Sequence, residues 1–247
     1  EAQTGTGGIH IANNRALTIG GISALVGVSA ARGDIAVSAA SPLQVAENVN
    51  TGAGNITLTA GETDDDPFCS DDLTVNAGVA VQAGAGSITL NAGDDIILGA
   101  GSALNAAASV ELNAGFNDLD NCGDFVDSGA TIAVGADLAI CVIGNLSVGG
   151  YSANGTVSLR SQNGAILDGN GSALNITGAA AALKANTGVG AFDSLETIVG
   201  NLEAATGSGG ISLVNFGAVT VGGVSPAACV GPLGGLDALT SGDIFLL

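Results

Sequence analysis

The amino-acid sequence predicts an all-β fold: a right-handed parallel β-helix, or β-solenoid, formed by residues 1–247 as a single domain. Three observations support this prediction. A short strand pattern recurs along the chain, two of its copies begin 22 residues apart (110 − 88), and the composition combines 41 Gly with only 3% aromatic residues. With coils of roughly 22 residues, the chain would make about eleven coils.

The recurring pattern is a β-branched residue, a polar residue and a Leu or Val, framed by small turn-forming residues. Its clearest copies are GNITLTAG at 54–61, GSITLNAG at 86–93 and SVELNAG at 109–115. Apolar and polar residues that alternate over about five positions predict a strand, and the flanking Gly and Asn residues predict turns. Shorter copies occupy residues 72–78, 155–159 and 210–213.

The spacing of the strands favours a solenoid over other all-β folds. Ile88 and Val110, and then Val110 and Ile132, are each 22 residues apart (110 − 88 and 132 − 110), which fits one three-sided coil. The two sheets of a sandwich pack about 10 Å apart and need large core side chains, whereas this chain supplies mainly Ala, Val, Ile and Leu. The right hand follows from the usual chirality of parallel crossovers.

The charge of the chain excludes two classes of partner. The net charge is -19, and the cationic side chains are Arg15, Arg32, Arg160 and Lys184. Nucleic-acid binding needs clustered Lys and Arg, and anionic lipid repels an acidic chain. No apolar run approaches the roughly 18 residues of a membrane helix, so we predict no membrane insertion. A mean hydropathy of +0.51 argues against disorder.

Two acidic insertions, each with one cysteine, interrupt the strand pattern. Residues 62–72 and 116–127 follow equivalent corners, and the coil between them turns the same corner with only Asp94 and Asp95. Because equivalent corners of a solenoid stack, the two loops should leave the same edge two coils apart. We therefore predict a Cys69–Cys122 disulfide. The rings that would pin the loops to the rod are Phe68, Phe116 and Phe125.

The state of Cys141 and Cys229 is left open by the sequence. The two residues lie several coils apart, which exceeds the Cα separation of a disulfide unless a loop reaches back or the partner belongs to the next subunit. A buried free thiol at Cys141, within the apolar strand 138–142, is the equal alternative, because Cys serves as a small core residue.

The inserts and the corner between them concentrate carboxylates at one edge of the predicted rod. Such hard oxygen ligands are what Ca²⁺ needs, although a solvated acidic rim that keeps the rod soluble is the alternative. Ca²⁺ is the cofactor that the sequence raises, and none is required by the predicted role. The candidate ligands are Asp64, Asp65, Asp66, Asp71, Asp94, Asp95, Asp118, Asp120 and Asp124.

The end of the chain repeats its beginning. Residues 203–225 match residues 1–23 without gaps at an offset of 202 (203 − 1). This super-repeat predicts either one unit of a tandem giant or a subunit that stacks end to end. The unpaired strand edges of a solenoid need a cover, and none is apparent in the sequence. The predicted assembly ends are Gly8, Ile9 and Ile11 on one side, and Ile244, Phe245 and Leu246 on the other.

The sequence resembles the filamentous-haemagglutinin-type repeat proteins, which are large secreted bacterial β-helix adhesins and surface fibres. The resemblance rests on GSITLNAGDDIILGAGSALNA at 86–106, GNITLTAG at 54–61 and the stretch that begins at Asn186 and ends at Gly223. It implies an elongated, non-enzymatic role at the cell surface or in an extracellular matrix such as a biofilm. It also implies the chain itself, and host or surface glycans, as partners.

These observations predict a structural subunit or repeat unit of an extracellular bacterial filament or adhesin that stacks head to tail. The alternative is a non-polymerising stalk segment of a giant adhesin. A β-helix polysaccharide-degrading enzyme would use Asp94 with Asp118 or Asp120, but the chain has no Trp, and His10 and Tyr151 are its only His and Tyr. An ice-binding Thr array is interrupted. We therefore predict no enzymatic activity.

Overall fold

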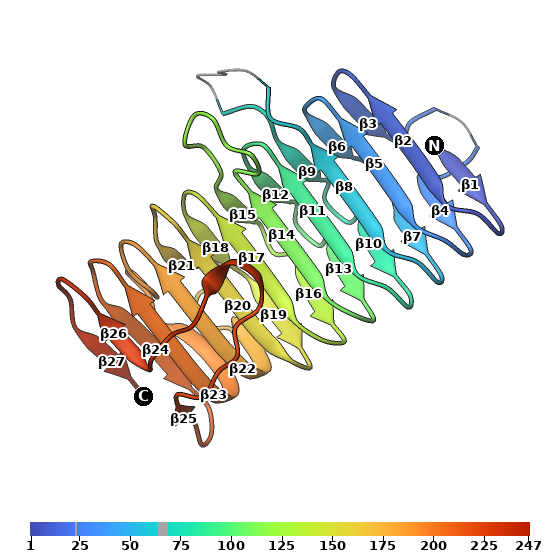
Figure 1. The fold of residues 1–247 in the computed structure, drawn as a ribbon. Coiled ribbons are helices and arrows are strands. Elements are labelled where there is room, and N and C mark those ends of the chain that lie inside the picture. The colour runs from blue at the N-terminus through green and yellow to red at the C-terminus, as the bar shows by residue number, and fades with distance from the viewer. Residues whose placement is uncertain (23, 64–68) are drawn as a thin grey trace.

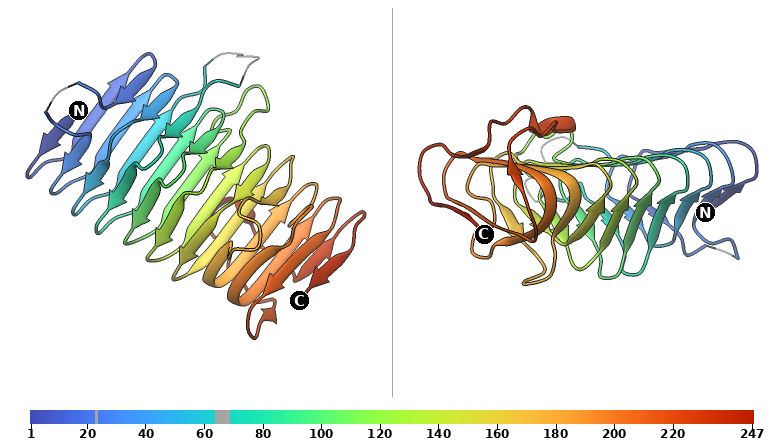
Figure 2. Two further views of the ribbon diagram at one scale, coloured as in Figure 1. Left: turned by 180° about the vertical axis from the view of Figure 1, so that it is seen from behind. Right: turned by 90° about the horizontal axis from the view of Figure 1, so that it is seen from below.

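The computed structural model describes residues 1–22, 24–63 and 69–247. In this part of the chain, short strands wind into an elongated solenoid with three faces, and the strand pairings are parallel (Figure 1). Figure 2 shows the coils stacked along one axis, with the chain termini at opposite ends of the rod. The predicted all-β parallel solenoid is confirmed, while its right hand stays a prediction.

The strands alternate among the three faces in chain order. The first face contains β1 (Ala2–Thr4), β4 (Val28–Ala30), β7 (Val49–Thr51), β10 (Ala80–Ala83), β13 (Ala103–Ala106), β16 (Thr131–Val134), β19 (Gly150–Ala153) and the beginnings of β22 (Ile176–Ala185) and β23 (Leu195–Thr206). The second face contains β2 (Ile9–Asn13), β5 (Ile35–Ala39), β8 (Ile56–Ala60), β11 (Ile88–Ala92), β14 (Val110–Ala114), β17 (Leu138–Val142), β20 (Thr156–Ser161), the remainders of β22 and β23, β25 (Thr220–Val221) and β26 (Leu236–Ala238). The third face contains β3 (Leu17–Ile19), β6 (Leu43–Val45), β9 (Leu73–Val75), β12 (Ile96–Leu98), β15 (Phe125–Asp127), β18 (Leu146–Val148), β21 (Ile166–Asp168), a bridge at Val189, the beginning of β24 (Ile211–Asn215) and the beginning of β27 (Ile244–Leu246). The remainder of β24 continues onto the first face, where it pairs with the beginning of β23.

Inward-facing residues stack in ladders that fill the narrow core. On the second face, the register aligns Ile35, Ile56, Ile88, Val110, Leu138 and Val157, and all of these side chains are fully buried. Burial of each such side chain contributes about 1.5–3 kcal/mol. The corners pack just as closely, because a Cβ on Gly86 would lie 2.1 Å from the carbonyl O of Gly54. Small residues are therefore required where the chain turns.

The coils are less uniform than the sequence spacing predicts. Ile88 does pair with Val110, but Val110 pairs with Leu138, 28 residues on (138 − 110), and Ile132 pairs with Leu104 on the first face. The prediction that Val110 and Ile132 are equivalent is wrong, because the insert at residues 116–127 lengthens this coil. The third face has ten levels within the described residues, close to the eleven predicted.

The two copies of the 202-residue repeat lie on different faces. Ala2–Thr4 form β1 on the first face, whereas the matching residues 204–206 belong to the second-face part of β23. Likewise, Ile9 begins β2 on the second face, and its counterpart Ile211 begins β24 on the third. These two matching segments are displaced by one face along the winding of the chain, whereas β25, the counterpart of Thr18–Ile19 on the third face, lies on the second face.

A strap, defined as residues 222–235, leaves the solenoid after β25 and returns at β26 (Figure 1). It contains the 3-10 helix η1 (Ala228–Val230), which packs on β17 and β20. Cys229 of the strap forms a disulfide with Cys141, and their Cα atoms lie 6.2 Å apart. The alternative of a loop that reaches back is confirmed. The alternative of a buried free thiol is wrong, because alternation along β17 turns Cys141 outward, where it is half-buried.

The strap buries side chains that point away from the core. Ala139, Ser158 and Ala182 occupy outward positions of β17, β20 and β22, yet all three are buried. The Ser158 hydroxyl accepts a hydrogen bond from the Ala227 N–H at 2.8 Å. Because these side chains are small, the strap can lie close to the sheet.

Each end of the solenoid has a strand edge without a partner among the described residues. β2 pairs with β5 and β27 pairs with β24, each on one edge. Of the predicted assembly ends, Ile244 and Phe245 are about half exposed and Leu246 is half-buried. Gly8 is exposed and Ile11 half-buried, but Ile9 faces the core and is buried, so the exposed apolar side chains near that end are instead Ile22, Leu25 and Val26. No helix of the described chain could span a membrane.

Candidate functional site

The candidate site lies at the acidic edge, which we define as the corner between the second and third faces at β8, β11 and β14. The three strands all end in Ala and are followed by Gly61, Gly93 and Gly115. The Gly93 N–H donates to the Ala60 carbonyl, and the Gly115 N–H donates to the Asp94 carbonyl, at 3.0 and 2.9 Å. Equivalent corners therefore stack, and the two inserts leave the rod one on either side of Asp94.

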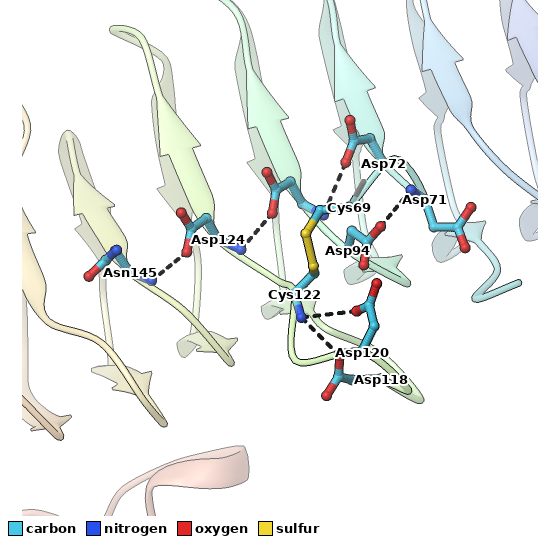
Figure 3. Close-up of a disulfide and its surroundings, with 10 residues drawn as sticks. Cys69, Asp71, Asp72, Asp94, Asp118, Asp120, Cys122, Asp124 and Asn145 are labelled. Carbon is cyan, nitrogen blue, oxygen red and sulfur yellow. Dashed lines mark hydrogen bonds between the residues drawn. A yellow bond between two sulfur atoms is a disulfide. The ribbon is translucent and has the colours of Figure 1, made fainter. Parts of the chain in front are cut away.

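A disulfide joins the two inserts above the middle corner. Cys69 and Cys122 are bonded, with Cα atoms 5.6 Å apart, and Asp94 lies next to them (Figure 3). The predicted pairing is confirmed. The prediction for the aromatic rings is only partly right. Phe116 is half-buried, and Phe68 lies outside the described residues.

Phe125 packs into the core of the third face and does not pin an insert. It pairs with Ile96 and Leu146 in the ladder and makes an edge contact with Tyr151, with ring centroids 6.4 Å apart. The Tyr151 hydroxyl in turn donates to the buried Asp127 carboxylate at 3.0 Å. Phe125 is the first residue of β15, so the period of the strand places its ring inside.

Two predicted calcium ligands, Asp95 and Asp124, belong instead to a row of hydrogen bonds that holds neighbouring coils together. Asp72 accepts a hydrogen bond from the Asp95 N–H, Asp95 from the Asp124 N–H, and Asp124 from the Asn145 N–H, at 3.2, 2.7 and 2.6 Å (Figure 3). Each of these residues directly precedes a third-face strand. Their carboxylates therefore satisfy backbone donors along the corner. For Asp95 and Asp124 this is a structural role that the sequence reasoning did not identify.

The remaining predicted ligands lie closer to the disulfide. Asp71 is buried and accepts two hydrogen bonds from Thr63, at its N–H and its hydroxyl, at 2.6 and 2.8 Å. Asp118 and Asp120 both accept from the Cys122 N–H, at 3.1 and 3.0 Å. The three residues Asp64, Asp65 and Asp66 lie outside the described part of the chain.

Three carboxylates converge beneath the inserts, and we call Glu62, Asp94 and Asp120 the acidic cluster. One oxygen of each lies within 4.8 Å of the other two. Glu62 was missed by the sequence reasoning, which considered only aspartates. The signal was present, since Glu62 follows Ala60-Gly61 as Asp94 follows Ala92-Gly93.

The acidic cluster changes the protonation of two of its members. Burial raises the pKa of Glu62 from 4.5 to about 7, and the neighbouring carboxylate of Asp94 adds to the effect. Burial also raises the pKa of Asp94 from 3.8 to about 6, against the hydrogen bond from the Asp71 N–H, which lowers it. Both shifts favour the uncharged form, because low-dielectric surroundings and like charges disfavour the carboxylate.

The enzyme hypothesis assigned a catalytic role to Asp94 together with Asp118 or Asp120. Asp94 is 0% exposed beneath the inserts. A general acid for a polysaccharide must reach the glycosidic oxygen. The position of Asp94 therefore does not suit the chemistry that this alternative requires.

No protein-family model, no curated protein and no solved structure matches the chain. The fold and the site define the molecule as a parallel β-solenoid with an acidic edge and a strap, cross-linked by two disulfides. Two disulfides fit an oxidising environment.

Proposed function

We propose that this chain is a structural element of an extracellular bacterial filament or adhesin, in which copies stack head to tail through the ends of their solenoids. The open strand edges at both ends of the parallel ladder support this proposal most strongly. An unpaired edge offers backbone donors and acceptors to another strand. The exposed side chains of Ile244 and Phe245 in β27, and of Leu247 directly after it, would be buried by a further coil.

An extracellular location is supported by the two disulfides and the acidic surface. Disulfides persist in oxidising compartments, and a net charge of -19 keeps rods from associating side by side. A role without catalysis agrees with the burial of Asp94 and with the use of Asp95 and Asp124 to bridge coils. Glycans at a host or bacterial surface are the external partners that this role would serve.

A stalk segment of a giant adhesin is the second candidate, because further coils of the same chain would cover the same open edges. In the filament the next coil belongs to another molecule, whereas in the stalk it belongs to the same polypeptide chain. Stacking predicts that the chain alone forms rods as its concentration rises. Ten levels spaced about 4.8 Å apart predict an axial repeat of about 48 Å in such rods.

Light scattering and electron microscopy of the oxidised chain test this proposal. We expect the mass to rise with concentration, and we expect Phe245→Asp to abolish the rise, because it places a charge at the stacking edge. Val126→Asp is the matched control. Val126 is also an exposed apolar residue, but its strand β15 lies in the middle of the rod and not at an end. A wild-type chain that stays monomeric at every concentration contradicts stacking and favours the stalk.

A further inference from the structure

The acidic cluster joins three successive coils of the solenoid. Glu62 follows β8, Asp94 follows β11, and Asp120 belongs to the second insert, after β14. Their nearest carboxylate oxygens lie within 4.8 Å of one another. The disulfide between Cys69 and Cys122 holds the inserts over this point. The cluster is therefore a fixed feature of the fold rather than a chance meeting of surface side chains.

Four oxygen atoms of the cluster are buried and have no hydrogen-bond partner in the structure: both oxygens of Glu62, Oδ1 of Asp94 and Oδ2 of Asp120. The second oxygen of Asp94 accepts from the Asp71 N–H at 2.7 Å, and that of Asp120 accepts from the Cys122 N–H at 3.0 Å. The backbone thus orients each Asp carboxylate and leaves one oxygen facing the cluster. Because buried polar groups are normally paired, these four oxygens are suited to a positively charged or hydrogen-donating partner.

Asp94 provides an observation that is independent of the acidity of the region. Its side chain is 0% exposed, although carboxylates are almost never fully buried unless they are paired. The charged groups that act most strongly on Glu62 are also acids, namely Asp94, Asp71, Asp120 and Asp118. Several buried carboxylates at this separation need a cation or shared protons to balance them.

We propose that Glu62, Asp94 and Asp120 bind one Ca²⁺ ion. Ca²⁺ takes about six to eight oxygen ligands, tolerates irregular geometry and accepts a bidentate carboxylate. Both oxygens of Glu62 are available for such a contact, and water would complete the shell. Mg²⁺ demands a near-ideal octahedron, which suits a bidentate Glu poorly.

A softer metal fits this place less well. Cys69 and Cys122 lie beside Asp120, but their sulfurs are joined in the disulfide and are not thiolates. An all-oxygen donor set favours Ca²⁺ or Mg²⁺ over Zn²⁺. The bound ion would link the coils of β8, β11 and β14 beneath the same inserts that the disulfide links above. This inference does not rest on the proposed stacking.

Calorimetric titration of the full, oxidised, chelator-treated chain with CaCl₂ tests the site, in about 0.15 M NaCl to screen the acidic surface. We expect saturable binding of one ion per chain and a higher melting temperature with Ca²⁺. Glu62→Gln and Asp94→Asn should each weaken binding at least tenfold. Asp137→Asn is the matched control and should bind as wild type does. Asp137, like Asp94, accepts a backbone N–H, from Thr156 at 2.7 Å, but lies at another corner.

The outcomes separate a specific site from a diffuse acidic rim. No saturable heat and no melting shift at millimolar Ca²⁺ overturn the proposal. Equal weakening of Ca²⁺ binding in all three variants also overturns the proposal. It would mean that binding depends on the net negative charge of the rod and not on these particular carboxylates. If Asp94→Asn fails to fold, Glu62→Gln decides, since Glu62 is half-buried and its carboxylate makes no hydrogen bond that the variant would lose. Light scattering remains a separate test of stacking.

Discussion

The two disulfides fasten the solenoid in contrasting ways. Cys69–Cys122 links inserts from corners two coils apart and covers buried carboxylates, whereas Cys141–Cys229 fixes a strap that crosses the second face over small, uncharged side chains. The acidic cluster requires a cation or shared protons to balance its charge. The strap requires only close packing. The comparison shows that a disulfide can hold either an acidic loop pair or a closely packed strap against the same solenoid.

Removing either disulfide should have the largest effect. For separations of 53 and 88 residues, the chain-entropy model gives losses of about 4 and about 4.6 kcal/mol in the free energy of unfolding. We expect similar losses when both cysteines of a pair are replaced by Ala, measured by urea unfolding. Hydrogen exchange at the Ala227 amide should rise only when the strap pair is removed, because that amide donates to Ser158. If exchange at the Ala227 amide rises equally in both variants, the inserts and the strap are not held independently of each other.

A larger side chain under the strap should have an intermediate effect. Ala182→Leu places three more carbons at a fully buried outward position, and we expect a loss of about 1–3 kcal/mol in the free energy of unfolding. Ala36→Leu is the control, because Ala36 occupies an outward position on β5 beyond the strap, in a groove of about 240 Å³. It should change stability by less than about 0.5 kcal/mol. Equal losses in thermal or urea unfolding would show that the strap does not pack as described.

The smallest effect is a pH dependence confined to the acidic cluster. In the metal-free protein, the raised pKa values of Glu62 and Asp94, about 7 and about 6, mean that the folded state retains protons that the unfolded state releases. This contribution to stability is complete below their ordinary values of 4.5 and 3.8 and is lost as the pH rises to about 7.

In chelator, the melting temperature of the wild type should therefore fall more steeply between about pH 4.5 and 7 than that of Glu62→Gln. Asp137→Asn should follow the wild type. Identical slopes for the wild type and Glu62→Gln would show that Glu62 does not titrate in this range.

The sequence predicted those features that depend on equivalent corners. The Cys69–Cys122 bond followed from inserts at the same position of two coils, and the corner after β11 was recognised as the one between them. The strap could not be found in this way. Within residues 222–235 only Cys229 indicates the target, and the sequence left its partner open; the other signal is distant, in small outward residues at Ala139, Ser158 and Ala182.

The predicted strand register is wrong where the local strand pattern and the length of the coil disagree. Val110 and Ile132 share the spacing of true partners, yet the insert at residues 116–127 lies between them. The strand pattern determines which side chains face inward, because it repeats every two residues. It does not determine which face of the solenoid a strand joins. That depends on the number of residues at each corner.

Ala2–Thr4 and Ile9 lie on the first and second faces, whereas the matching residues 204–206 and Ile211 lie on the second and third. A strand that carries its own alternation can be accommodated on any side of the triangle, so a duplicated gene segment need not encode a whole number of turns. A sequence repeat in such a rod can therefore begin on one face of the solenoid and recur on another.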